Sequence, residues 1–171
     1  TLSVLRLGQK QIPSSITLVR LEGGLLQGLA SEKESELFYA KQIKKFPNYP
    51  LLYLDRARMR WKMKKKNLAL DDARKALEIK PGSFEALYLI GIILSNTSDQ
   101  KSPEKLEEAL GILISASKIN SNNPDLWLRI SALWERKNNI HMAKIAMIRA
   151  VELSPESEIF LRRLTLLLEK E

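Results

Sequence analysis

Apolar residues recur along most of the chain at the three- and four-residue spacing of amphipathic helices. Leu87, Ile90 and Leu94 form one such stripe, and Trp127, Ile130 and Trp134 form another, so both stripes are expected in the core. The pattern predicts four antiparallel helix pairs and a single helix from about residue 158 to the end. The pairs are expected over residues 16–46, 50–80, 84–120 and 124–154.

Prolines set the register of these pairs. Pro13, Pro47 and Pro81 are 34 residues apart, and the interval from Ser121 to Pro155 is again 34. The interval between Pro81 and Ser121 is 40. A period of about 34 residues is that of the tetratricopeptide repeat, in which each repeat is a pair of helices.

The longer interval predicts about six extra residues, Asn96–Lys101, in a loop between the two helices of the third pair. Ser102 before Pro103, and Asn123 before Pro124, have the order of an N-cap followed by proline at the first helical position. Both sites are therefore expected to begin a helix.

Small residues align at the positions where the two helices of a pair must approach closely. They are Ala57, Gly91 and Ser131 in first helices, and Ala69, Ala109, Ala143, Ala76, Ala116 and Ala150 in second helices.

Three short segments carry a resemblance to the tetratricopeptide-repeat family. Residues 76–81 (ALEIKP) and 150–155 (AVELSP) resemble the end of a repeat, and residues 122–127 (NNPDLW) resemble its usual entry into the next. The resemblance covers nearly the whole chain. It implies an all-α, right-handed α-solenoid of antiparallel helix pairs with a terminal capping helix. The expected organisation is a remnant of a preceding helix or an N-terminal extension at 1–15, repeats at 16–49, 50–83, 84–123 and 124–157, and the capping helix at 158–171.

The first two repeats depart from the family pattern. Arg56 and Arg60 stand where the family usually carries leucine and an aromatic residue, so the second repeat is predicted to pack less regularly, with Met59 and Trp61 in compensation. In the first repeat, Glu22-Gly23-Gly24 lies inside a helix, where glycine costs about 1 kcal/mol relative to alanine.

Composition fits a folded, helix-rich protein and offers little for catalysis. Hydrophobic residues make up 44% and charged residues 28%, and no apolar run reaches the length of a membrane span. Cysteine is absent and His141 is the only histidine. Phosphate-binding loops, nucleophile elbows and zinc-binding helix motifs are lacking, so no enzyme activity, cofactor or metal site is predicted. A chain that starts at Thr1 leaves the compartment unknown: cytoplasmic, or periplasmic or secreted after removal of a signal.

The resemblance implies a concave groove lined by the first helix of each repeat. Carried over position by position, it places a set of residues there, with Trp61 as a candidate peptide anchor. The set is Arg20, Gln27, Leu54, Asp55, Arg58, Trp61, Lys62, Tyr88, Ile92, Asn96, Asp125, Arg129, Arg136 and Arg162. Because guanidinium groups bind carboxylates bidentately, the predicted function is a scaffold or adaptor that holds a partner protein or extended peptide, with an acidic peptide as the suggested ligand.

Two other functions are alternatives. Residues 41–66 contain ten basic residues and the single acid Asp55, a net charge of +9. The whole chain has a net charge of +8, so the rest of it is nearly neutral. A basic patch in this segment, Lys62, Lys64, Lys65 and Lys66, suggests attachment to anionic membrane or nucleic acid, although the aromatic content of 6% disfavours nucleic acid. The apolar terminal helices suggest an oligomerising assembly factor that associates through its C-terminal helix.

Overall fold

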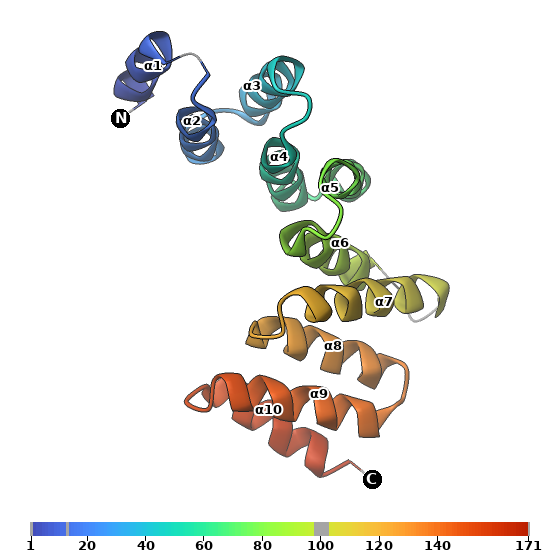
Figure 1. Cartoon of the computed structure of the whole chain (residues 1–171). Coiled ribbons are helices and arrows are strands. Elements are labelled where there is room, and N and C mark those ends of the chain that lie inside the picture. The colour runs from blue at the N-terminus through green and yellow to red at the C-terminus, as the bar shows by residue number, and fades with distance from the viewer. Residues whose placement is uncertain (1, 13, 98–102, 171) are drawn as a thin grey trace. The chain divides into compact units, whose positions relative to one another are not determined.

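The computed structural model describes residues 2–12, 14–97 and 103–170, which form ten helices and no strand (Figure 1). The chain divides into two compact units, Thr1–Pro81 and Gly82–Glu171. The first unit contains α1 (Leu2–Gln11), α2 (Ile16–Leu29), α3 (Glu32–Lys45), α4 (Pro50–Lys62) and α5 (Lys66–Ile79). The second contains α6 (Phe84–Thr97), α7 (Pro103–Ile119), α8 (Pro124–Arg136), α9 (Ile140–Leu153) and α10 (Glu158–Leu168).

Local capping interactions explain where several helices begin. Asn123 accepts a hydrogen bond from the backbone N–H of Leu126 at 3.0 Å, and Pro124 follows as the first helical residue, as predicted. Ser31 and Glu34 form a reciprocal capping box at the start of α3. The predicted cap Ser102 and most of the predicted insertion lie outside the described residues.

In the first unit, α4 packs along α5, and α2 contacts α1, α3 and α4. Leu52, Ala57 and Met59 of α4 are buried against this core. The two arginines expected to make the second pair pack less regularly do not keep its helices apart, because α4 and α5 are in contact as extensively as the helix pairs of the second unit. Their charges are neutralised internally, as described below.

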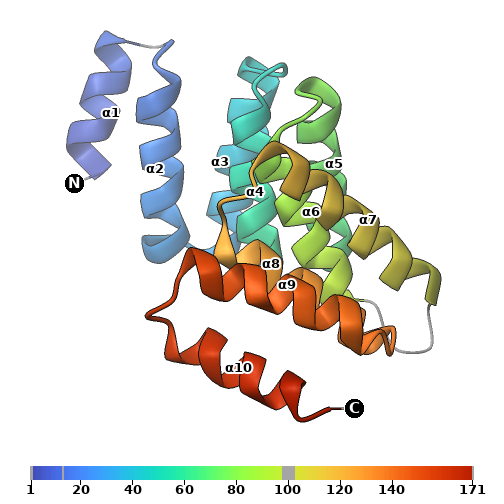
Figure 2. The same ribbon diagram turned by 60° about the horizontal axis from the view of Figure 1, so that its bottom comes forward.

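In the second unit, α6 packs on α7 and α8 on α9, and α10 lies beside α9 (Figure 2). Gly91 of α6 is buried so close to α7 that a β-carbon placed on it would meet Leu113 Cδ2 at 2.1 Å. At the equivalent place in α8, the Ser131 hydroxyl donates to the Ala143 carbonyl oxygen at 2.9 Å. All nine aligned small residues are buried, which confirms the close helix approach predicted from the sequence.

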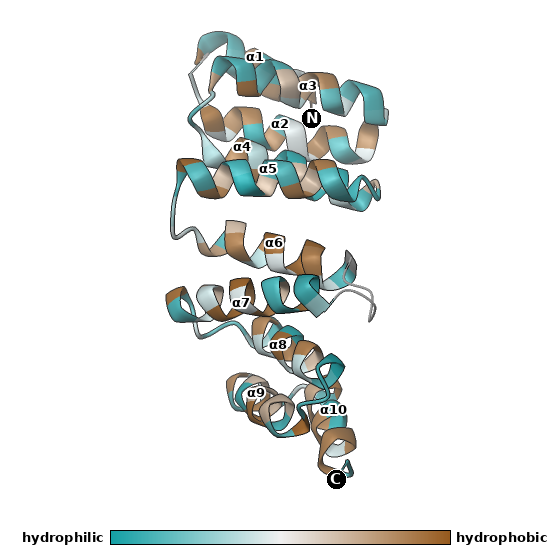
Figure 3. Ribbon diagram, turned by 90° about the vertical axis from the view of Figure 1, so that its right-hand side faces the viewer, coloured by the Kyte–Doolittle hydropathy of each residue, from teal (hydrophilic) through white to brown (hydrophobic). Residues whose placement is uncertain are grey.

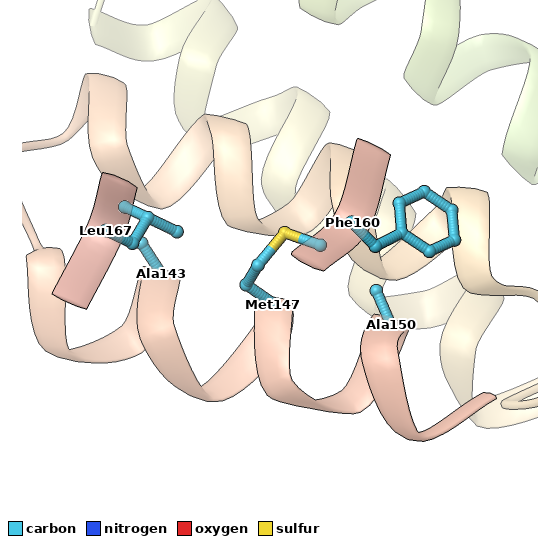
Figure 4. Packing of buried hydrophobic residues seen from close by; sticks show 5 residues of the cluster. All are labelled: Ala143, Met147, Ala150, Phe160 and Leu167. Atoms are coloured by element: carbon cyan, nitrogen blue, oxygen red, sulfur yellow. The ribbon is translucent and has the colours of Figure 1, made fainter. Parts of the chain in front are cut away.

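The last helix is held by a small apolar cluster with α9 (Figure 4). Phe160 and Leu167 of α10 reach Met147 and the alanines of α9, and Trp127 and Trp134 of α8 pack against the same cluster. Of the predicted stripe, Ile130 is buried in the core, and the two tryptophans are half-buried against it. Hydrophobic residues nevertheless occur around much of α10, and α6 is also largely hydrophobic (Figure 3).

Candidate binding surfaces

Two basic residues of the predicted groove set meet one acid in the first unit. Arg20 of α2 donates to Asp55 of α4 through Nε at 2.6 Å and through Nη2 at 3.2 Å. Arg58 Nη1 donates to the same carboxylate at 3.2 Å. The hydrogen bond to Asp55 is the main cause that raises the pKa of Arg20. These arginines are thus partly occupied by an internal carboxylate.

The other groove candidates in the first unit have different surroundings. Leu54 is fully buried, so its placement in an accessible groove is wrong: an apolar side chain on this helix gains more in the core than at the surface. Gln27 donates from Nε2 to the Tyr39 hydroxyl at 2.9 Å. Trp61 is half-buried and Lys62 is exposed.

A partly buried ionic network, absent from the predicted set, links three helices of this unit. Arg56 binds Asp72 bidentately, with its Nε 2.8 Å and its Nη2 2.7 Å from the two carboxylate oxygens. Arg60 bridges Asp72 of α5, at 2.9 Å, and Glu36 of α3, at 2.9 Å. Burial would raise the pKa of Glu36, but the hydrogen bond and charge of Arg60 outweigh it and lower that pKa.

The basic patch is likewise partly paired. Lys65 Nζ lies 3.4 Å from a Glu32 oxygen and 3.7 Å from a Glu36 oxygen. Lys62, Lys64 and Lys66 are exposed, and Lys64 has a positive φ of 60° at the turn between α4 and α5. Folding therefore brings acids from α3 onto a segment that is almost purely basic in sequence.

In the second unit, α6 and α8 lie in contact and bring aromatic and basic residues together. The rings of Phe84 and Tyr88 stack nearly parallel, with centroids 5.6 Å apart and an interplanar angle of 8°. The guanidinium of Arg129 lies over the Tyr88 ring, 5.8 Å from its centroid, and its Nε donates to the Tyr88 hydroxyl at 3.2 Å. Neither Nη group of Arg129 has a hydrogen-bond partner among the described residues.

The other predicted groove residues of the second unit's α6 and α8 lie elsewhere along these two helices. Arg136 Nη1 donates to the Ser95 carbonyl oxygen at 2.6 Å, and Asn96 Nδ2 donates to the Ile92 carbonyl oxygen at 2.8 Å. Ile92 is half-buried. Asp125 is exposed at the start of α8.

Near the C-terminal end of α8, an acid that was not predicted as a site residue is hydrogen-bonded to residues of α10 and of the segment after it. Glu135 accepts hydrogen bonds from Arg163 and, at 2.7 Å, from Lys170 Nζ. Arg162 is exposed, and no described residue forms an ion pair with it. Phe84 and Glu135 were missed because the family pattern does not assign them to the groove, although Phe84 lies four residues before Tyr88, the spacing at which helical side chains meet.

Within residues 2–12, 14–97 and 103–170, no group of three or more metal-binding side chains converges on one point. Nor does any helix in these ranges have both the length and the apolar character needed to cross a membrane. His141, the only histidine, is exposed near the start of α9.

No family model matches the sequence, and neither does any curated protein. Solved structures do match. MamA 41-end from Desulfovibrio magneticus RS-1 is 17% identical with a TM-score of 0.75, over 88% of this chain and 82% of that one. YrrB, described as a TPR protein with an unusual peptide-binding site, is 18% identical with a TM-score of 0.71. The match covers 95% of this chain and 80% of YrrB. Yeast Tom70 is 16% identical with a TM-score of 0.85, and the match covers 95% of this chain and 34% of Tom70.

These likenesses establish the fold. The chain is an all-α protein of tetratricopeptide-type helical repeats, as its prolines and small residues predicted.

Proposed function

We propose that the protein is a non-catalytic scaffold that binds an extended segment of a partner protein across α6 and α8 of its second unit. The function class is supported by the tetratricopeptide-type fold, whose repeats present extended binding surfaces. Within the proposal, repeats at 16–49, 50–83, 84–123 and 124–157 and a capping helix at 158–171 remain the preferred division of the chain.

One observation carries the choice of surface. Arg129 is fixed on Tyr88 through its Nε, while its two Nη groups keep their N–H donors available. A guanidinium already held in place loses less side-chain entropy when it binds a carboxylate than a freely rotating one does. Beside it, the stacked Phe84 and Tyr88 rings offer apolar area for a partner side chain. An acidic or carboxylate-bearing peptide is the ligand that suits this pair.

Selection from a random-sequence peptide display library, followed by fluorescence anisotropy, tests the proposal. Selected peptides should be enriched in acidic residues, and Arg129→Gln should weaken their binding about tenfold, as expected for a lost hydrogen bond to a charged group. Arg149→Gln on α9 is the matched control, because Arg149 is also half-exposed but lies on another helix and pairs with Glu152. Equal binding by the wild type and Arg129→Gln would refute the assignment.

Self-association through α10 is a second candidate. Ile159, Leu161, Leu166 and Leu168 are 43–72% exposed on this short helix, and large apolar side chains gathered in this way often mark an interface. Replacing Leu161 and Leu168 by lysine should convert a concentration-dependent dimer to a monomer in sedimentation velocity. A wild-type protein that is monomeric at every micromolar concentration tested would exclude this function.

A further inference from the structure

The first unit contains a cleft that none of the predicted sites includes. It has a volume of about 460 Å³ and lies among α1, α2 and α3. Arg6, Gln9 and Lys10 line it from α1, and Lys41 and Gln42 line it from α3. Glu22 of α2, which is almost completely buried, is its one acidic residue.

The carboxylate of Glu22 is already satisfied by α1. Arg6 Nε donates to its Oε1 at 2.8 Å, and Gln9 Nε2 donates to its Oε2 at 2.8 Å. Arg6 uses only Nε in this pair, and its Nη groups form no hydrogen bond within the described part of the chain. The salt bridge thus fixes a guanidinium at the rim of the cleft with most of its donors unused.

Three further donors in the cleft have no partner among the described residues. Lys10 and Lys41 are exposed and form no ion pair there. Gln42 is only 8% exposed, yet its side-chain amide makes no hydrogen bond to any described residue. No buried polar side-chain atom of the described residues lacks a hydrogen-bond partner, so the Gln42 amide must be open to the cleft, where it can donate to a ligand that enters.

We propose that this cleft binds a phosphate group carried on a side chain of a partner protein. Arg6, Lys10 and Lys41 against Glu22 leave a net charge of two positive units, which matches a phosphomonoester of about −1.5 to −2 better than a single carboxylate. Its oxygens can accept hydrogen bonds from a guanidinium, two ammonium groups and an amide together. That the carrier is a protein rests on the scaffold function proposed above.

The recessed position of Gln42 favours a side chain over a lipid surface. Cations that project outwards are best placed to bind the headgroups of a bilayer. The Gln42 amide instead lies within the cleft, where only a ligand that enters the cleft can reach it. A phosphorylated side chain on an extended segment can enter in this way.

The test uses the whole chain and two fluorescent degenerate peptide libraries, one with a fixed phosphoserine and one with serine in its place. Anisotropy at near-physiological salt should give at least roughly tenfold tighter binding of the phosphorylated library. Lys10→Ala with Lys41→Ala should remove about tenfold of that affinity, and Gln42→Met should weaken binding without changing charge. Lys33→Ala with Lys44→Ala is the matched control, because both lysines are exposed on α3 outside the cleft.

Three results would overturn the proposal. Equal binding of the two libraries would exclude phosphate recognition. Equal losses in the cleft and control double variants would mean unspecific attraction of anions. Binding to vesicles containing a phosphoinositide, with no binding of the phosphoserine library, would assign the cleft to a membrane headgroup. Arg129→Gln should leave phosphopeptide binding intact. The experiments can therefore refute the proposed α6–α8 surface and the proposed phosphate site independently of each other.

Discussion

Replacement of Gly91 by alanine tests whether close helix approach is what the repeat pattern encodes. The new β-carbon would lie 2.1 Å from Leu113 Cδ2 and 2.6 Å from Leu113 Cγ. Leu113 is fully buried, so it cannot swing into solvent, and either its rotamer or the spacing of α6 and α7 must change. Such overpacking costs about 3 kcal/mol at the upper end of its usual range.

Helix propensity acts in the opposite direction. Alanine in a helix interior is favoured over glycine by about 1 kcal/mol, so the net destabilisation of Gly91→Ala should be about 2 kcal/mol. Gly111 of α7 is the matched control, because a β-carbon there would meet nothing within 4 Å. Gly111→Ala should therefore stabilise the protein by about 1 kcal/mol.

Urea denaturation followed by circular dichroism measures both free energies of unfolding. A double variant separates the overlap from other effects: in a Leu113→Ala background the added β-carbon has room, so Gly91→Ala should become neutral or stabilising. If Gly91→Ala unfolds at the wild-type urea midpoint, or costs the same in both backgrounds, the contact with Leu113 does not set the spacing of this pair.

Four other substitutions have definite expected outcomes. Lys64→Gly should stabilise by about 1 kcal/mol, because Lys64 has a φ of 60°, whereas Asn138→Gly at a φ of 57° should change little, since asparagine tolerates this conformation; thermal unfolding compares them. Glu36 has a lowered pKa, so the stability it contributes is present above its unfolded value of 4.5 and is lost as pH falls through the folded value; Arg60→Gln should remove this acid dependence of the urea midpoint. Phe160→Ala should cost about 3 kcal/mol and raise hydrogen exchange throughout α10.

Helix positions were predictable from the sequence because their determinants are local. Proline at the first helical position, as in Pro50 and Pro124, and small residues at a fixed offset act within one repeat. The α8 cap at Asn123 could be read directly from its neighbours. These signals repeat about every 34 residues, so each one also checks the others.

The ionic contacts could not be predicted in the same way, because they join residues with no regular spacing. Arg56 and Asp72 are 16 residues apart, and Glu36 and Arg60 are 24 apart. In sequence, the arginines interrupt an apolar pattern and suggest that the second pair packs less regularly. In the folded unit, neighbouring helices bring their carboxylates to them, and α4 and α5 pack closely.

The groove candidates show why residue type at a repeat position does not determine a binding role. Arg20 and Arg58 share one internal carboxylate, Asp55, and any external acid must compete with it. Arg129 instead pairs with the Tyr88 hydroxyl, a neutral group that orients the guanidinium without cancelling its charge. A charge held in position but not neutralised attracts an anion more strongly than one in an ion pair. For this reason the binding surface proposed here is placed on α6 and α8, although basic residues recur on the first helices of both units.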